Sequence, residues 1–329
     1  MRKGIAVLGA SGFLGTSLVK RLNQSYQNIL ACDLLEGDPD QEYLYVDVEN
    51  LESLEQIQGV DCIINLAAVH RDDVNPLSRY FEVNVQGAIN ICETARRYQI
   101  SKIIFTSSVA IYGFAPPDTD ESGKPNYFNE YGRTKFLAEE VFKEWYSEDS
   151  NNRTLIIIRP TVIFGEGNRG NVYNLLKQIA SGRFVMTGDG LNKKSMAYVE
   201  NVSAFLEHSI TIEPGFHVYN YIDKPDLDMN SLVKLARRTL LNKEGVGLRM
   251  PGFIGIALGY IADFLAFLTR LNLPVSSIRV KKFMGTTQFS SAANETGFTP
   301  PVSLEEGLDR TLRYEFLEDN SGKRTFDTE

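Results

Sequence analysis

Through the first half of the chain, short apolar segments alternate with longer segments of helical periodicity. The apolar segments have the length and β-branched content of buried strands, and a helical or connecting segment separates each from the next. Parallel strands need such crossovers, so the alternation predicts βαβ units and a parallel sheet. The predicted strands are residues 4–9, 29–33, 43–46, 62–67, 102–106 and 155–158, and the predicted helices are 12–22, 77–98 and 131–145.

After Pro160 the pattern changes to glycine-rich turns and shorter elements. We therefore predict an α/β fold, a Rossmann-type doubly wound parallel sheet with a smaller C-terminal substrate-binding domain. The nucleotide-binding domain is expected over residues 1–165, with about 190–213 returning to the sheet. The second domain is expected over about 166–189 and 214–329. The tail after Phe316 is polar, so we expect it to be frayed.

Residues 252–268 are mostly apolar and include Asp263 and a Gly255-x-x-x-Gly259 pair. The segment is short for a membrane span of about 20 residues and carries a charge. We predict a buried or interface helix and no transmembrane span, with peripheral membrane contact as the alternative.

Charge and cysteine content exclude several functions. The formal net charge is -8 and the basic residues are dispersed, which disfavours nucleic-acid binding. Cys32, Cys62 and Cys92 have no metal-ligand spacing, so we expect no metal site and a reducing, cytoplasmic environment. Glycines interrupt the apolar start of the chain, so we read no export signal there.

Gly9, Gly12 and Gly15 follow a predicted strand and open a predicted helix. Glycines at this spacing allow a tight turn and close approach of a pyrophosphate, which the helix N-terminus attracts. Asp33 ends the second strand, where an acid accepts hydrogen bonds from a ribose. No arginine follows it, which favours NAD over NADP; a turn-forming aspartate is the alternative. The residues expected at the cofactor are Gly9, Ser11, Gly12, Phe13, Leu14, Gly15 and Asp33.

Tyr131 and Lys135 lie four residues apart, on one face of a predicted helix. A free tyrosine has a pKa near about 10, and a nearby cation lowers it. The pair therefore predicts an acid/base for redox chemistry at carbon, whereas a chance pair on a solvated helix is the alternative.

Together these residues resemble the extended short-chain dehydrogenases/reductases, in particular the NAD-dependent nucleotide-sugar epimerase/dehydratase group. The resemblance covers essentially the whole chain and is strongest through residue 202. It rests on the glycine loop, Asp33, Tyr45-Val46-Asp47-Val48, Asn65-Leu66-Ala67-Ala68, Val83-Asn84-Val85, Thr106 to Gly113, the Tyr131/Lys135 pair and Arg159-Pro160.

The resemblance implies further site residues. Asp47 and Val48 would contact the adenine; Leu66, Ala67, Ala68 and Pro160 would line the dinucleotide, and Asn84 would support it. Ser108 aligns with the catalytic serine and would hold the oxygen at the reacting sugar carbon, with Ser107 as the competing assignment. Asn171, Lys194 and Arg279 would meet the substrate phosphates and His70 the sugar, although solvated or structural roles are the alternatives.

In the related 4,6-dehydratases an Asp and a Glu follow the catalytic hydroxyl residue. Here these places hold Val109 and Ala110, which carry no proton, so dehydration is disfavoured. The resemblance implies a homodimeric C4 epimerase of a nucleotide sugar, with a UDP-linked substrate expected. A 4-keto-sugar reductase is the main alternative, followed by a steroid-like or small-carbonyl reductase and a non-catalytic cofactor-binding protein.

Overall fold

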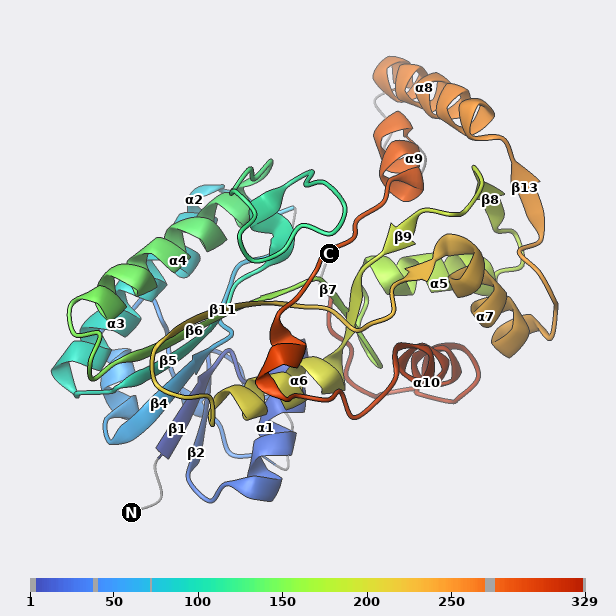
Figure 1. The fold of residues 1–329 in the computed structure, drawn as a ribbon. Coiled ribbons are helices and arrows are strands. Elements are labelled where there is room, and N and C mark those ends of the chain that lie inside the picture. The colour runs from blue at the N-terminus through green and yellow to red at the C-terminus, as the bar shows by residue number, and fades with distance from the viewer. Residues whose placement is uncertain (1–3, 38–40, 72, 270–275, 328–329) are drawn as a thin grey trace.

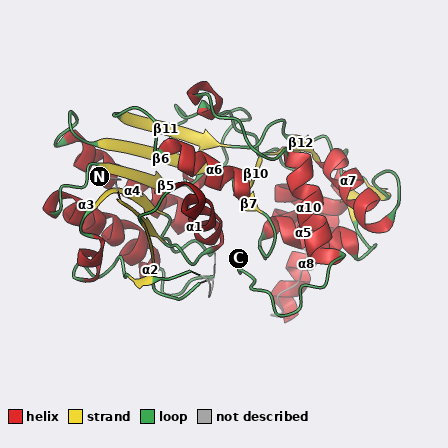
Figure 2. Cartoon of the chain, turned by 90° about the horizontal axis from the view of Figure 1, so that it is seen from below, coloured by secondary structure: helices red, strands yellow, loops and turns green. Residues whose placement is uncertain are grey.

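The computed structural model describes residues 4–37, 41–71, 73–269 and 276–327. A parallel sheet with helices on both faces forms the larger part of the molecule, and a mainly helical part lies beside it (Figures 1 and 2). The predicted Rossmann-type α/β fold is confirmed.

The main sheet contains seven parallel strands in the order β11-β6-β5-β4-β1-β2-β3. The chain leaves β1 toward β2 on one side and later returns to β4 on the other, so a topological switch point lies between β1 and β4. In such sheets ligands bind at the carboxyl ends of the strands near this point. The strands are β1 Gly4–Leu8, β2 Ile29–Asp33, β3 Leu44–Tyr45, β4 Val60–Asn65, β5 Lys102–Thr106, β6 Thr154–Pro160 and β11 Phe216–Tyr221.

Helices cover both faces of the sheet. Along β1, Ala6 and Leu8 join the apolar core beneath α3 and α4, whereas Ile5 and Val7 join the core beneath α1 and α6. This explains why the strands read as continuous apolar runs. The helices are α1 Phe13–Ser25, α3 Gly87–Arg97, α4 Glu130–Ser147 and α6 Val199–Ser209, and the predicted helix over 77–98 is divided into α2 Ser78–Phe81, a π-helical turn Glu82–Gln86 and α3.

The sheet extends further along the chain than predicted. The chain packs on the sheet again through α6, preceded by β10 (Met196–Tyr198), which pairs with β7 (Val162–Phe164). However, β11 also pairs with β6 along its full length, so the chain stays with the sheet to Tyr221. As an edge strand, β11 is partly exposed and mixes polar and aromatic residues, so the pattern of apolar runs does not predict it.

The second part has its own apolar core. Helices α5 (Asn171–Ala180), α7 (Met229–Leu241) and α10 (Leu304–Phe316) enclose it. Helices α8 (Gly252–Thr269) and α9 (Ser277–Met284) project from it at the top of Figure 1. None of the helices in the described residues is long and apolar enough to cross a membrane. The short strand pairs here are β8 Val185–Thr187 with β13 Leu248–Met250 and β9 Lys193–Lys194 with β12 Leu227–Asp228.

The C-terminal tail is attached to the body, so the expectation of fraying is wrong up to residue 327. The Phe326 amide donates to the Gly167 carbonyl at 2.9 Å, and its carbonyl accepts from the Arg169 amide at 2.8 Å. The Phe326 ring also lies 5.6 Å from the Phe13 ring, centroid to centroid. A single aromatic residue at the end of a polar stretch makes these contacts, which a compositional argument overlooks.

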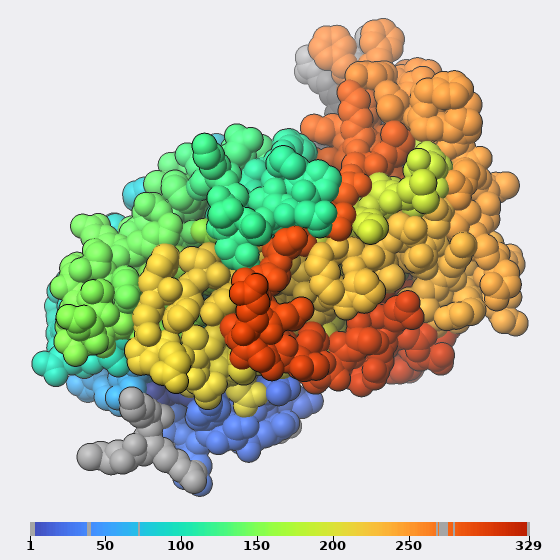
Figure 3. Space-filling model, viewed as in Figure 1, coloured from blue at the N-terminus to red at the C-terminus, as the bar shows by residue number. Residues whose placement is uncertain are grey.

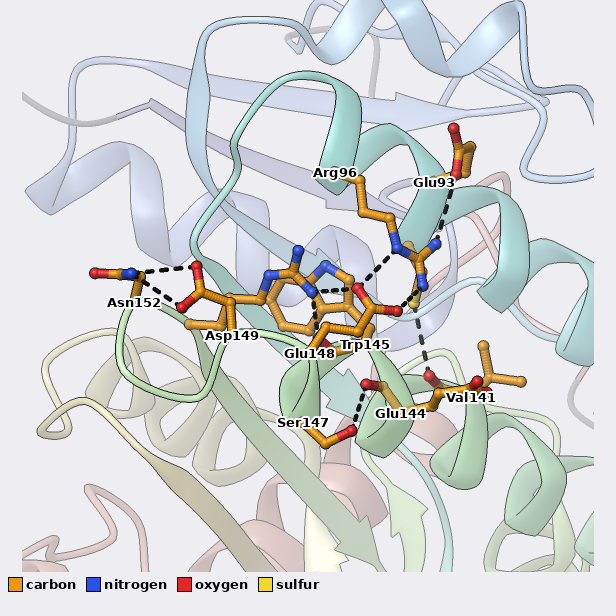
Figure 4. Close-up of polar contacts among 11 residues, drawn as sticks. Glu93, Arg96, Val141, Glu144, Trp145, Ser147, Glu148, Asp149 and Asn152 are labelled. Carbon is orange, nitrogen blue, oxygen red and sulfur yellow. Dashed lines mark hydrogen bonds and ion pairs between the residues drawn. The ribbon is translucent and has the colours of Figure 1, made fainter.

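Ion pairs join α3 to the end of α4, as Figure 4 shows. Glu148 accepts from Arg96 at 2.5 Å and from Arg153 at 2.7 Å, and Arg96 also contacts Glu93. The two guanidinium groups lower the pKa of Glu148 to about 2. Because Arg96, Glu93 and Glu148 are partly exposed to solvent, their ion pairs add little stability.

A second ion pair is buried. Arg159 on β6 donates to the Glu139 carboxylate on α4 from Nε at 2.8 Å and from Nη2 at 2.6 Å. Its Nη1 donates to the Tyr112 hydroxyl at 2.6 Å, and that hydroxyl donates to Asn220 on β11 at 2.9 Å. The network therefore joins α4, β6, β11 and the turn that follows Ser108.

Removing one partner of this pair should be strongly destabilising. Glu139→Ala leaves a buried guanidinium without its counter-ion, so we expect the free energy of unfolding to fall by about 3–5 kcal/mol. Urea denaturation measures the change. The control is Glu140→Ala, which removes an exposed carboxylate on the same helix and should change stability by less than about 1 kcal/mol. Equal effects of the two substitutions would contradict the role given to the network.

Candidate active site

A cavity of about 920 Å³ opens at the carboxyl ends of the sheet strands. It is lined by the glycine loop, the ends of β2 and β5, the loops after β3 and β4, and the start of α4. Segments of the second part and the C-terminal tail complete the lining. The cavity therefore lies at the topological switch point, where the fold favours a nucleotide ligand.

Two glycines of the glycine loop have no room for a side chain. A Cβ on Gly9, whose φ is +80°, would lie 2.7 Å from the Ala67 nitrogen. A Cβ on Gly15 would lie 2.1 Å from the Gly9 oxygen. Gly12 caps α1 and offers no side-chain acceptor to the first amides of that helix. These amides are positioned to receive an anionic group.

Asp33 closes β2 and is held by the loop that it faces. Its Oδ2 accepts from the Ser11 amide at 2.8 Å and its Oδ1 from the Leu34 amide at 2.7 Å. A carboxylate has further acceptor sites, so these bonds leave it able to accept from a ribose. Leu34 and Leu35, which line the cavity beside it, bring no cation.

The other residues expected at the cofactor mostly line the same cavity: Ser11, Phe13, Leu14, Asp47, Val48, Leu66, Ala67, Ala68 and Pro160. Asp47 also caps the turn after β3, since its Oδ1 accepts from the Glu49 amide at 2.9 Å.

Asn84 is the exception, because it does not line the cavity. Its side chain accepts from the Val69 amide at 2.8 Å, and it donates to the Val69 carbonyl and to Thr134 at 3.0 Å each. Asn84 therefore holds the loop after β4 against α4. It positions the cavity wall rather than contacting a ligand in the cavity.

Ser108, Tyr131 and Lys135 converge on this cavity from two elements. Ser108 follows β5, and its Oγ accepts from the Ala110 amide at 3.1 Å. Helix α4 begins at Asn129, whose side chain accepts from the Gly132 amide at 2.9 Å, and this cap sets the helical register of Tyr131 and Lys135.

The electrostatics of the pair differ from the sequence-based expectation. The Lys135 ammonium donates to the Thr106 carbonyl at 2.8 Å and lies 6.0 Å from the Tyr131 ring centroid. Burial lowers the pKa of Lys135 to about 7, which the carboxylate of Glu139 opposes. Burial raises the pKa of Tyr131 to about 12, although a hydrogen bond with Ser108 opposes the shift. Desolvation therefore exceeds the expected effect of the lysine on the phenol.

Two buried hydroxyl groups in the cavity wall indicate what kind of ligand the cavity fits. Thr106 Oγ1 and Ser107 Oγ are buried, line the cavity and have no hydrogen-bond partner among the described residues. Buried polar atoms without partners are uncommon unless a ligand or water satisfies them. With the glycine cradle, the α1 amides and Asp33, these atoms fit a bound dinucleotide.

The four expected substrate residues have different outcomes. His70 and Asn171 line the cavity, and desolvation lowers the pKa of His70. Lys194 is not among the lining residues, and its ammonium donates to the Lys282 carbonyl at 2.9 Å and the Gly285 carbonyl at 2.6 Å, so the expected phosphate contact stays a prediction. The Arg279 side chain, on α9, lies outside the described residues.

The sequence patterns missed several residues that line the cavity. Arg79 lies there in a paired state, bonded to Glu49 and Glu82. Arg324 stacks on the Phe326 ring at 5.0 Å and could hold a phosphate. Ser195, Thr287 and Phe289 reach the cavity from the second part. These residues have no local motif, because only the tertiary fold brings them to the site.

Comparison with known proteins identifies the family. The model of the NAD dependent epimerase/dehydratase family matches residues 5–220. The chain belongs to the NAD-dependent epimerase/dehydratase family. The resemblance noted in the sequence is thereby confirmed, and NAD is the cofactor that the cavity fits.

Two curated relatives match nearly the whole chain. The chain is 45% identical over 333 aligned positions, covering 100% of both chains, to an N-acetyl-alpha-D-glucosaminyl-diphospho-ditrans,octacis-undecaprenol 4-epimerase of Escherichia coli O157:H7. It is 25% identical to a UDP-glucose 4-epimerase of Vibrio cholerae, covering 98% of each chain.

Solved structures share the fold. A UDP-glucose 4-epimerase of Thermotoga maritima with UDP-glucose has a TM-score of 0.72 at 22% identity, and covers 94% of this chain and 98% of its own. A UDP-glucuronic acid 4-epimerase of Bacillus cereus in complex with NAD has a TM-score of 0.71 at 18% identity, with the same coverage.

The position of Asp33 predicts cofactor preference. Asp33→Asn keeps one carbonyl acceptor for the loop and removes the charge that repels a 2′-phosphate. We expect the ratio of the NADP to the NAD dissociation constant to fall by about tenfold, measured by calorimetry. The control is Glu36→Gln, which removes a nearby exposed charge outside the cavity. Tighter binding of NADP by the wild type, or an unchanged ratio in Asp33→Asn, would show that Asp33 does not select the cofactor.

Burial of Lys135 predicts a pH-dependent stability. The unfolded chain keeps the lysine proton up to about 10.5, whereas the folded chain releases it near pH 7. The unfolded state therefore binds more protons in this window, and folding stability rises with pH. We expect the free energy of unfolding of cofactor-stripped wild type, relative to Lys135→Met, to increase between about pH 7 and about pH 9. Denaturant titrations measure it. The absence of this rise would contradict the pKa assigned to Lys135.

Proposed function

We propose that this protein is an NAD-dependent C4 epimerase of a hexose or N-acetylhexosamine carried on a diphosphate. The observation that carries the proposal is the convergence of Ser108, Tyr131 and Lys135 on the cavity that holds the glycine cradle. Full-length similarity to two 4-epimerases supports it.

Each residue has a defined role in the mechanism. Tyr131 accepts the proton of the C4 hydroxyl, and Ser108 donates a hydrogen bond that holds the C4 oxygen in line. Lys135, four residues along α4, places a cation beside the phenol. When bound, NAD supplies a hydride acceptor and a nearby positive charge. That charge acts on Tyr131 in the direction opposite to burial, which by itself raises the phenol pKa to about 12.

Oxidation and reduction occur at the same carbon. Tyr131 accepts the C4 hydroxyl proton as C4 is oxidised to a planar ketone, and it returns that proton to the oxygen after the sugar has turned its other face. NAD held by the glycine cradle and Asp33 would supply the two-electron chemistry, taking a hydride from C4 and giving it back. Val109 and Ala110 follow Ser108 and carry no acid or base, so the site lacks the groups that elimination of water would need there.

The diphosphate that carries the sugar is either a polyprenyl diphosphate or UDP. The Escherichia coli relative is named for a polyprenyl-diphosphate substrate and the Vibrio cholerae relative for a UDP-sugar. The higher identity over the full chain favours the polyprenyl carrier, with UDP-N-acetylhexosamine as the second candidate. With either carrier, we propose a role in polysaccharide biosynthesis.

We also propose that the enzyme works in the cytoplasm as a homodimer. Cys32, Cys62 and Cys92 are buried thiols, which is typical of proteins in a reducing compartment. Exposed apolar side chains on α2 and α3, Phe81 and Ile89, support a subunit interface on that face.

The reaction can be tested with one variant. Tyr131→Phe keeps the aromatic ring but removes the proton carrier, so we expect epimerisation to fall by about 10³-fold or more while NAD stays bound. Chromatography of the C4 epimers measures the rate of epimerisation, and the absorbance of cofactor released on denaturation measures how much NAD is bound. The exposed Tyr260→Phe serves as a control and should be as active as the wild type in detergent.

Two results would contradict the proposal. One is substantial epimerisation by Tyr131→Phe with full cofactor occupancy. The other is stoichiometric consumption of NADH with a 4-keto sugar and no epimer formed from any carrier, which would indicate a reductase.

A further inference from the structure

Helix α8 exposes most of its large apolar side chains and buries two of its glycines. Phe253, Phe264 and Phe267 are 74%, 62% and 80% exposed, and Tyr260 and Ile261 are more than half exposed. Residues 253, 257, 260, 264 and 267 recur at spacings of four and three, so they form one stripe along the helix. A continuous apolar face of this kind is unusual on a soluble surface and indicates a binding surface.

The opposite side of α8 holds it against the protein. A Cβ on Gly255 would lie 2.3 Å from the Thr187 side chain, and one on Gly259 would lie 2.7 Å from the Ser277 backbone. Asp263 accepts from the Ser277 amide at the start of α9 at 3.2 Å. Gly255, Gly259 and Asp263 therefore fix α8 to its neighbours and leave the aromatic face outward. The same residues favour a buried or interface helix in the sequence analysis.

Basic groups border this face. The Lys281 ammonium donates to the Tyr260 hydroxyl at 2.8 Å, and Lys282 lies 5.2 Å from the Phe128 ring centroid. Lys194 donates to the carbonyls at the end of α9 and so anchors the helix pair. Although the chain is acidic overall, the border of the exposed apolar face is cationic.

The same surface continues to the active site. Phe114 and Phe128 are exposed and stack at 4.9 Å, and Lys282 bridges from α9 to them. Phe114 follows Gly113, which lines the cavity, and Thr287, just beyond α9, lines it as well. Figures 1 and 3 show the loop of residues 113–129, in green, and the α8–α9 pair projecting from the same upper side of the molecule.

We propose that the outward face of α8, with Lys281 and Lys282, docks on the surface of an anionic lipid bilayer. Aromatic and aliphatic side chains bordered by lysines match the boundary between acyl chains and headgroups. A second copy of the chain suits the surface less well, because helix pairs place charged residues beside their apolar stripe and α8 has no charged residue other than Asp263, which is bonded to α9.

Docking defines the substrate class. A bilayer beneath α8 and the Phe114–Phe128 pair brings membrane lipid to the mouth of the cavity. The sugar is then presented on a polyprenyl diphosphate whose chain stays in the bilayer, while the diphosphate and sugar reach Tyr131. This assignment of the substrate class rests on the proposed epimerase function, whereas the docking itself does not.

The docking is tested by flotation of the full-length protein with vesicles of phosphatidylcholine and phosphatidylglycerol. We expect the wild type to float with the vesicles and Phe264→Glu to lose at least about fivefold in bound fraction, with a larger loss in Phe264→Glu/Phe267→Glu. The matched control is Leu317→Glu, which adds the same charge at an exposed apolar residue on the far end of α10 and should float as the wild type does. Binding should also weaken when phosphatidylglycerol is omitted.

Two outcomes overturn the docking. One is a wild type that does not float, or that floats no better than Phe264→Glu. The other is a change of oligomeric state in Phe264→Glu, measured by light scattering without lipid, which would assign the face to a second copy of the chain.

A separate assay tests the substrate class. Epimerisation of a polyprenyl-diphosphate-linked N-acetylhexosamine is measured in vesicles and in detergent micelles. We expect Phe264→Glu to be about tenfold slower than the wild type in vesicles and equal to it in micelles, because only the first assay needs docking. Equal rates in vesicles overturn the link between docking and substrate. A wild type that floats but epimerises no sugar in either assay overturns the epimerase function and leaves the docking intact.

Discussion

The structure of the catalytic region depends on the buried ion pair between Arg159 and Glu139. The pair fixes α4 to strand β6, and Tyr112 extends the network to the turn after Ser108. Ser108 and Tyr131 come from different elements, so their separation is set by how these elements pack. Burying two charges offers little net stability, but a partner left alone is costly, so the network favours one arrangement of the elements over others.

The site is built to work with a charged cofactor beside it. Burial disfavours the charged forms of both Lys135 and Tyr131. Neither side chain stabilises the charge on the other enough to cancel this effect of burial on its pKa. The orphaned hydroxyls of Thr106 and Ser107 and the glycine cradle indicate where further partners belong. The chain therefore supplies geometry and proton carriers, and the redox step belongs to the dinucleotide.

The two parts of the molecule divide these tasks. The sheet domain carries the acid/base residues and the cofactor cradle, which is the part that the family model matches. The second part closes the cavity with Ser195, Thr287 and Phe289 and projects the α8–α9 pair. The C-terminal tail joins the two, since Phe326 contacts both Phe13 and the loop at Gly167. The proposed selection of the substrate and its carrier therefore depends on segments outside the catalytic motifs.

The sequence by itself determined the features that local patterns encode. Short continuous apolar runs alternating with helical periodicity predicted the Rossmann-type sheet, glycine spacing predicted the cradle, and a four-residue helical spacing predicted the Tyr131/Lys135 pair, because each depends on neighbours along the chain. Tertiary structure decided the rest. It placed β11 in the sheet, bonded Lys194 to the carbonyls at the end of α9, brought Arg324 and Phe326 to the edge of the cavity and set the pKa of Tyr131. It also decided that the apolar face of α8 is outward, since a helical pattern shows that a face is apolar but only packing determines what covers it.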